Sequence, residues 1–162
     1  MSSRYNISSS TLCRLIILKF KVLKNHKKSP EKSWKVLIFS SKNCAGTLSI
    51  VINKTEYFYS SKGILKCRVG HSLFGKPDYT FQAGRVFTSK HLINDWLAEA
   101  RQNYFSPENY LFLTHNCNTF SDHLLFFLTG INIPDFVKNQ LATVNNTPYG
   151  QIWTRIIALN SP

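Results

Sequence analysis

The most regular pattern in the chain is a pair of short apolar runs separated by two polar residues. Leu48–Ile52 and Thr55–Tyr59 are rich in β-branched and aromatic residues, and only Asn53-Lys54 lies between them. Two such runs joined by a turn-forming dipeptide are typical of a β-hairpin. The apolar runs Trp34–Phe39 and Tyr79–Phe87 predict two further strands. Together these segments indicate a small antiparallel sheet.

Apolar residues at helical spacing predict two helices in the second half of the chain. The first follows the capping pair Thr88-Ser89 and runs to about Asn103. The second carries Cys117 in its first turn and ends at Gly130. The residues expected to face the core from these helices are Leu92, Trp96, Ala100, Phe120, Leu124, Phe127 and Leu128. The sum is a mixed α+β domain in which a small antiparallel sheet packs with helices.

The remaining segments are expected to be less regular. Residues 60–79 contain three glycines and Pro77, and they predict a loop with few regular elements. Tyr110–Thr114 predicts an extended approach to Cys117, and Pro134 opens a last short helix over residues 135–141. Leu15–Leu23 mixes apolar and basic residues in a strand-like alternation.

Composition narrows the class of protein. The chain has 162 residues, of which 43% are hydrophobic, so it is long and apolar enough to form one folded domain. No apolar run approaches the ~18 residues of a membrane span or the core of a secretory signal. We therefore expect a soluble, intracellular protein with no membrane span.

The net charge of +12 is concentrated near the N-terminus. Residues 1–42 carry ten Lys or Arg and one acid, a net of +9, whereas residues 67–162 carry seven and six, a net of +1. Such an arm could bind an anionic partner, or it could be a solvated basic tail. No nucleic-acid motif accompanies the charge, and the tail is the favoured interpretation.

Cys117 is the residue whose position most strongly indicates chemistry. A thiol in the first turn of a helix faces unpaired backbone N–H groups and the positive end of the helix dipole, which stabilise the thiolate. Asn116 and Asn118 flank it, either as polar support or as ordinary helix caps, and we favour capping. The chain has no CxxC pair, so neither a metal site nor another cofactor is expected. The other cysteines, Cys13, Cys44 and Cys67, are expected to be small buried hydrophobes.

Several short motifs, in order and at matching spacing, resemble one family. They are Ser49–Val51, Glu56–Phe58, Gly63-Ile64, Cys67, Gly70, Phe74-Gly75, Pro77-Asp78, Tyr110, His115–Ser121, Leu128–Pro134 and Thr147–Gln151. This pattern is similar to the PPPDE peptidases, which are permuted papain-fold cysteine isopeptidases, and most similar to the desumoylating isopeptidases among them. The resemblance divides the chain into a divergent basic N-terminal segment, residues 1–45, and a PPPDE-type domain, residues 46–158.

The resemblance implies a function and its partners. Cys117 would be the nucleophile, and a histidine on the hairpin strand would be its base. The substrates would be proteins conjugated to a ubiquitin-like modifier, with SUMO favoured, and the modifier's glycine tail would lie in a narrow groove. In the family a second copy helps to form this groove, so a homodimer is implied, as is a location in the cytoplasm or nucleus.

The chain departs from the family at the base. The family's histidine precedes the Ser-Ile-Val strand by two residues, and here that position is Thr47. A threonine hydroxyl does not titrate near neutral pH, so Thr47 cannot carry the thiol proton to a leaving amine. Loss of the base would cost on the order of 10³–10⁶ in rate.

Five histidines are available as substitutes. His71, in the glycine-rich loop, and His115, two residues before Cys117, are the candidates. His123 is expected to face solvent, and His26 and His91 are expected at the surface. Three interpretations stay open: a cysteine isopeptidase, a pseudoenzyme that binds a modifier tail or partner without cleaving it, and an interaction module that works through the basic arm.

Overall fold

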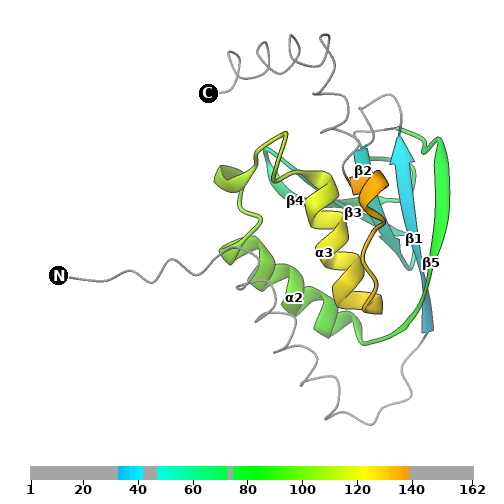
Figure 1. Cartoon of the computed structure of the whole chain (residues 1–162). Helices are drawn as coiled ribbons and strands as arrows, with labels where there is room; N and C mark the ends of the chain where they lie inside the picture. Colours follow the sequence, from blue (N-terminus) through cyan, green and yellow to red (C-terminus); the bar gives the residue numbers. More distant parts are fainter. Residues whose placement is uncertain (1–32, 42–46, 73–74, 139–162) are drawn as a thin grey trace.

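A five-stranded antiparallel sheet forms one layer of the molecule (Figure 1). The computed structural model describes residues 33–41, 47–72 and 75–138. The strands are β1 (Ser33–Ser41), β2 (Thr47–Ile52), β3 (Thr55–Ser60), β4 (Gly63–Arg68) and β5 (Tyr79–Phe87), arranged in the order β4-β3-β2-β1-β5. Every neighbouring pair is antiparallel. The strand predicted in the N-terminal segment, β1, lies inside this sheet between β2 and β5.

The predicted hairpin is confirmed as β2 and β3. Asn53 and Lys54 form its turn with positive φ angles of 46° and 65°. Two consecutive positive φ values define the turn type whose twist matches that of paired strands, and Asn tolerates this conformation well. The register pairs Ile52 with Thr55 and Ile50 with Tyr57. This register places Leu48, Ile50 and Ile52 of β2 in the core.

The prediction of an irregular segment over residues 60–79 was wrong in part. Gly63–Arg68 forms β4, which pairs with β3 over its whole length. Gly63 has φ of +86°, a conformation that glycine adopts without strain, and it closes the tight turn that starts β4. The three glycines of this segment led to the prediction of a loop, although one of them forms the turn of a second hairpin.

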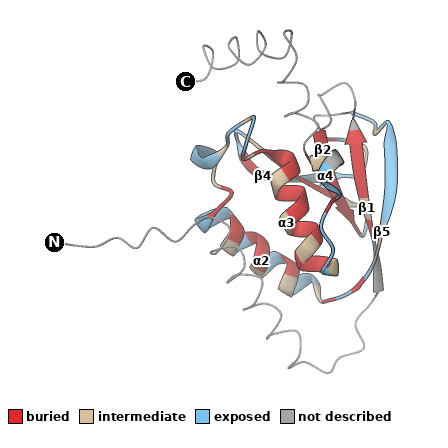
Figure 2. Cartoon of the chain, viewed as in Figure 1, coloured by how far each residue is buried: buried red, intermediate tan, exposed pale blue. Residues whose placement is uncertain are grey.

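Two helices cover one face of the sheet (Figures 1 and 2). They are α2 (Lys90–Asn103) and α3 (Cys117–Thr129), and the short elements η1 (Pro107–Asn109) and α4 (Asp135–Lys138) flank α3. Trp96 of α2 stacks on Phe127 of α3 with ring centroids 5.1 Å apart, and both side chains are buried. Phe120 and Leu124 of α3 are fully buried against the sheet. The α+β fold is therefore confirmed, with the core between α2, α3 and β1–β4.

The extended segment predicted over Tyr110–Thr114 is instead a tight turn. Leu111 forms an isolated antiparallel bridge with His115, and the residues between them turn back on themselves. The apolar side chains here misled the prediction, because Leu111 is exposed and not part of a buried strand. The turn delivers the chain to the start of α3.

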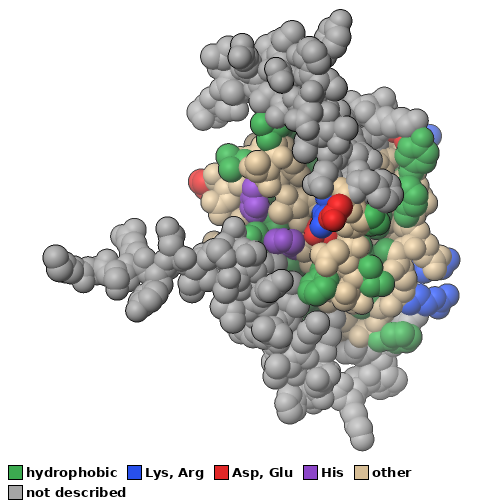
Figure 3. Space-filling view, viewed as in Figure 1, with side chains coloured by type: hydrophobic (Ala, Val, Ile, Leu, Met, Phe, Trp, Pro, Cys, Tyr) green, Lys and Arg blue, Asp and Glu red, His purple; other side chains and the backbone are tan. Residues whose placement is uncertain are grey.

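Strand β5 forms one edge of the sheet. Its aromatic residues Tyr79, Phe81 and Phe87 are exposed, and hydrophobic and basic side chains line this edge in Figure 3. The strand-like segment Leu15–Leu23, Cys13, Cys44, His26 and most of the basic arm lie outside the described residues. Among the described helices, none has the length and apolar character that a membrane crossing requires.

Candidate functional site

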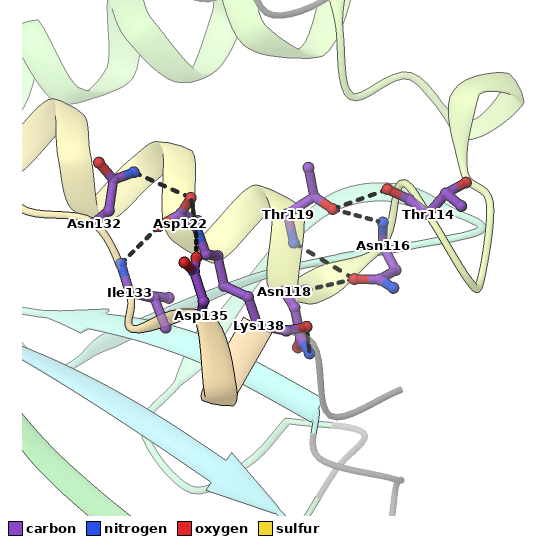
Figure 4. A network of polar contacts seen from close by, with 9 residues as sticks. All are labelled: Thr114, Asn116, Asn118, Thr119, Asp122, Asn132, Ile133, Asp135 and Lys138. Carbon is purple, nitrogen blue, oxygen red and sulfur yellow. Dashed lines mark hydrogen bonds and ion pairs between the residues drawn. The ribbon is translucent and has the colours of Figure 1, made fainter. Parts of the chain in front are cut away.

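The start of α3 is fixed by its capping residue, Asn116. The Asn116 side-chain oxygen accepts hydrogen bonds from the N–H groups of Asn118 (2.9 Å) and Thr119 (3.4 Å), and the Thr119 hydroxyl accepts from the Asn116 N–H (Figure 4). This reciprocal capping box makes Cys117 the first residue of the helix. The prediction that Cys117 lies in the first turn, with Asn116 as cap, is confirmed.

Asn118 has a different task, because its side chain connects α3 to β2. It is 2% exposed, and its Oδ1 accepts the Leu48 N–H at 3.1 Å and the Cys117 thiol at 3.4 Å. Its Nδ2 donates to the carbonyl oxygen of Lys138 at 3.4 Å. The favoured interpretation of Asn118 as a helix cap was wrong. Residue order could not show that β2 would lie against this amide.

Strand β2 brings Thr47 to the Cys117 sulfur. The Thr47 side chain and the Leu48 N–H both form hydrogen bonds with the sulfur. The two positions that the sequence analysis coupled are therefore in contact, although they are 70 residues apart. Thr47 is itself buried, with 7% of its surface exposed. The site joins a strand and a helix start, with a hydroxyl where the resemblance places an imidazole.

Burial decides the protonation state of Cys117. The side chain is 5% exposed, and this loss of solvation raises the pKa of the Cys117 thiol above its ordinary 9.0. Hydrogen bonds from Leu48, Thr47 and the first N–H groups of α3 lower the pKa, but by less than burial raises it. The prediction of a stabilised thiolate, made from the position of Cys117 in the helix, was therefore wrong. The resting group is a thiol whose proton points at the Asn118 oxygen.

Few donors are left at the helix start for a developing oxyanion. The N–H groups of Asn118 and Thr119 are already taken by the Asn116 oxygen. The N–H of Cys117 contacts its own sulfur, as does that of Leu48. Of the first three N–H groups in α3, those of Cys117 and Asn118 act on the reacting sulfur, and the second is shared with the Asn116 oxygen.

Tyr110 is a neighbour of the sulfur that sequence reasoning did not single out as a site residue. Burial, followed by the negative charge of an ionised Cys117, raises the pKa of Tyr110 to about 12. Its ring packs edge-on against Tyr59 at a centroid distance of 5.2 Å. The phenol is therefore neutral at physiological pH and can donate a hydrogen bond, but it cannot accept the thiol proton.

His115 is held by its surroundings on the other side of the turn. Its Nδ1 donates to the carbonyl oxygen of Asn109 at 2.8 Å, and its ring stacks on Phe105 at 4.9 Å. Burial lowers the pKa of His115, and the Asn109 carbonyl opposes this shift. Within the described residues, no imidazole contacts Cys117. The substitute-base role of His115 stays a prediction that this geometry does not favour.

The other histidines differ in their surroundings. His71 is exposed, and its backbone N–H donates to the Arg68 carbonyl oxygen in the turn after β4. His91 is exposed at the start of α2 and pairs with Asp95 at 2.7 Å, as expected of a surface residue. The prediction that His123 faces solvent was wrong in part, because its side chain is half-buried. Its ring lies 5.4 Å from Tyr104 and 5.5 Å from Phe105, the two residues that directly follow α2.

Asp122 ties the segment after α3 back to the helix (Figure 4). Its carboxylate accepts the Ile133 N–H at 2.6 Å, the Asn132 amide at 3.1 Å and the Lys138 ammonium at 3.2 Å. This network holds α4 beside α3, which brings the Lys138 carbonyl to Asn118. The described residues contain no group of three His, Cys, Asp or Glu side chains placed to hold a metal ion.

A small pocket is lined in part by Thr47. It is a shallow pocket, open to solvent on one side, with a cavity volume of about 10 Å³, which is room for one group the size of a water molecule. Its lining residues are Phe39, Ser40, Thr47, Ser49, Glu56, Ser72, Gly75 and Pro77. These residues come from β1, β2, β3 and the loop before β5. Thr47 both lines the pocket and contacts the Cys117 sulfur, so the pocket adjoins the site.

Comparison with known proteins finds a family match over most of the chain. The sequence profile of the PPPDE peptidase domain matches residues 32–158. Desumoylating isopeptidase 1 from Rattus norvegicus and its Homo sapiens counterpart are each 37% identical to the chain over 103 residues, and the Xenopus laevis protein is 35% identical. The aligned part covers 64% of this chain and 61% of each relative. The matched domain includes β1, which lies in the segment that the sequence analysis set apart from the domain.

Proposed function

Because this chain belongs to the PPPDE peptidase family, we propose that it is a cysteine isopeptidase acting on SUMO-like conjugates through Cys117. The observation that supports this most is the contact between β2 and the start of α3, where Thr47 and Leu48 reach the Cys117 sulfur. The relatives named desumoylating isopeptidase 1 favour SUMO among the ubiquitin-like modifiers. The cytoplasmic or nuclear location, the homodimer and the anionic partner of the basic arm stay predictions.

The chemistry of such a site follows from its contacts. The Cys117 sulfur attacks the carbonyl carbon after the modifier's last glycine, an S–C bond forms, and the C–N bond to the substrate lysine breaks. The thiol proton must pass to the departing amine, and Asn118, which accepts that proton in a hydrogen bond, is not a base. Thr47 can donate a hydrogen bond but cannot relay the proton at neutral pH. We infer that acylation is slow in this protein.

A second candidate is a protein that binds the modifier tail without cleaving it. Two observations favour it. Thr47 occupies the base position, and burial raises the pKa of the Cys117 thiol, so both halves of the usual thiol activation are weakened. The fold and the groove would then serve recognition alone.

A modifier bearing an electrophilic group at its C-terminus distinguishes the two candidates. The isopeptidase should form a covalent adduct with the SUMO probe, and the Cys117→Ala variant should not. Cys67→Ala is the matched control, because Cys67 is the other free cysteine of the described region and lies away from β2 and α3, so this variant should still be labelled. Adduct formation is read by intact mass.

The unlabelled outcomes are also informative. Binding of the unmodified modifier without any adduct would select the non-cleaving candidate. Neither binding nor labelling, with a ubiquitin probe also unreactive, would overturn both candidates.

A further inference from the structure

The pocket beside Thr47 has a polar floor that the proposed chemistry does not use. Glu56 of β3 and Ser49 of β2 line it and are 2% and 3% exposed. The Ser49 hydroxyl donates to Glu56 Oε1 at 2.8 Å, and the Gly70 N–H donates to Oε2 at 3.2 Å. Both partners are neutral donors, as a carboxylate requires. Glu56 thus places a negative charge inside the sheet face that lies opposite the helices.

The charge of Glu56 has no cationic partner among the described residues. The described ion pairs join Asp122 and Asp135 to Lys138 and Asp95 to His91. Burying a carboxylate whose hydrogen bonds come only from neutral donors costs free energy, and a cation bound beside it would offset that cost. The pocket therefore favours a positively charged group that can also donate hydrogen bonds.

Ser72 supplies a second, independent indication of a ligand. Its side chain is 9% exposed and lines the same pocket, yet its hydroxyl has no hydrogen-bond partner. A buried hydroxyl without a partner costs about 1–3 kcal/mol. Ser40, which is 7% exposed, adds another polar wall. The pocket thus combines an anion with an unused hydroxyl that can accept a hydrogen bond.

We propose that this pocket binds a primary ammonium group at the end of an aliphatic chain, namely the ε-ammonium of the substrate lysine. The proposal rests on the proposed function, because it assigns the leaving-group side of the same site. When the thioester forms, the lysine amine departs with the thiol proton and takes a second proton from water, since its pKa is about 10.4. An ammonium with three donors then meets Glu56, Ser72 and Ser40 next to Thr47.

The proposal explains how a site with a weak base could still favour cleavage. An ammonium held in the pocket is no longer a nucleophile, so it cannot attack the thioester and reverse the first step. The pocket also favours modifiers conjugated to lysine over modifiers conjugated to other residues, because the released lysine side chain carries its positive charge at its end, where it can reach Glu56. Both effects depend on Glu56 and not on the thiol.

The test measures binding of a lysine side chain apart from any cleavage. Titration of the full-length Cys117→Ala protein with Nα-acetyl-lysine amide, followed by NMR chemical shifts, should show saturable binding that perturbs residues around Glu56 and Ser72. Nα-acetyl-norleucine amide has the same chain without the ammonium and should bind at least about tenfold more weakly. Glu56→Gln should weaken lysine binding by about 10- to 100-fold, because hydrogen bonds to charged groups contribute most.

Matched controls make the result interpretable. Glu108→Gln removes an exposed carboxylate elsewhere and should leave binding unchanged. Ser72→Ala should weaken binding a few-fold without removing the charge. Equal binding of the lysine and norleucine amides to the Cys117→Ala protein, or no binding of either, would overturn the proposal. This result does not depend on whether the Glu56→Gln variant folds. Modifier labelling of the protein with Cys117 intact is unaffected by these outcomes, so the two proposals fail separately.

Discussion

Replacing Asn118 by alanine tests whether one amide fixes the geometry between β2 and α3. The Leu48 N–H is bound by the Asn118 oxygen at 3.1 Å, and Leu48 is fully buried. Without the amide, the Leu48 N–H keeps only the Cys117 sulfur, which is a weak acceptor, and the thiol loses its own acceptor. These two losses cost about 1.5–2.5 kcal/mol together, and losing the 3.4 Å bond to the Lys138 carbonyl adds about 0.5 kcal/mol. We expect the free energy of unfolding to fall by about 2–3 kcal/mol.

Urea denaturation followed by circular dichroism measures this change. In a chain of this size it corresponds to a fall in Tm of about 5–10 °C. Asn132→Ala is the control, because Asn132 is exposed and makes one amide contact, to Asp122 at 3.1 Å. That variant should lose less than about 1 kcal/mol. If the two variants lost the same small amount, Asn118 would not hold the strand to the helix, and the reasoning would be refuted.

Two further predictions concern pH. Because burial raises the pKa of Cys117 above its ordinary 9.0, iodoacetamide should alkylate this residue slowly near neutral pH. The alkylation rate should still be rising at about pH 9, where the rate for a free cysteine levels off. Equal alkylation rates for Cys117 and glutathione at neutral pH would contradict the raised pKa. The unfolded chain loses that thiol proton first, so the wild-type protein should lose stability above about pH 9 more steeply than Cys117→Ala does. Burial lowers the pKa of His123 from 6.5 to about 4, so the unfolded chain takes up the proton first as the pH falls. The free energy of unfolding should decline between about pH 6.5 and pH 4 by up to about 3 kcal/mol, at 1.36 kcal/mol per pH unit. If the His123→Gln variant lost as much stability over this pH range as the wild-type protein, the His123 ring would not be the cause.

The fold was largely predictable because local chemistry decides its elements. The dipeptide Asn53-Lys54 between two β-branched runs determined the hairpin, and Asn116 with Thr119 determined where α3 begins. Strand β4 was missed because its glycine was read as a loop residue when it closes a turn. The turn before α3 was missed because an exposed leucine looks like a buried one in sequence.

The proximity of Cys117 and Thr47 was predictable, because the resemblance coupled these two positions and the structure brings them into contact. The role of Cys117 as nucleophile stays a prediction. The sequence could not predict the pKa of the Cys117 thiol. That pKa depends on the balance between burial and hydrogen bonding at the sulfur, and so on how closely β2 packs over α3. The surroundings of Tyr110 and His123 were missed, and the less favoured interpretation of Asn118 as polar support was the right one, because the neighbours of all three residues come from other elements.

The central claim is that Cys117 is a nucleophile whose usual base has been replaced by Thr47. The Thr47 side chain already reaches the sulfur, so a side chain that starts from the same backbone position begins next to the thiol. The most direct test compares single-turnover cleavage of a SUMO–lysine conjugate by the wild-type protein and by Thr47→His, with Cys117→Ala as the blank. We predict a gain of at least about a hundredfold for Thr47→His, within the range that a catalytic base provides. Equal rates for Thr47→His and the wild-type protein would contradict the claim.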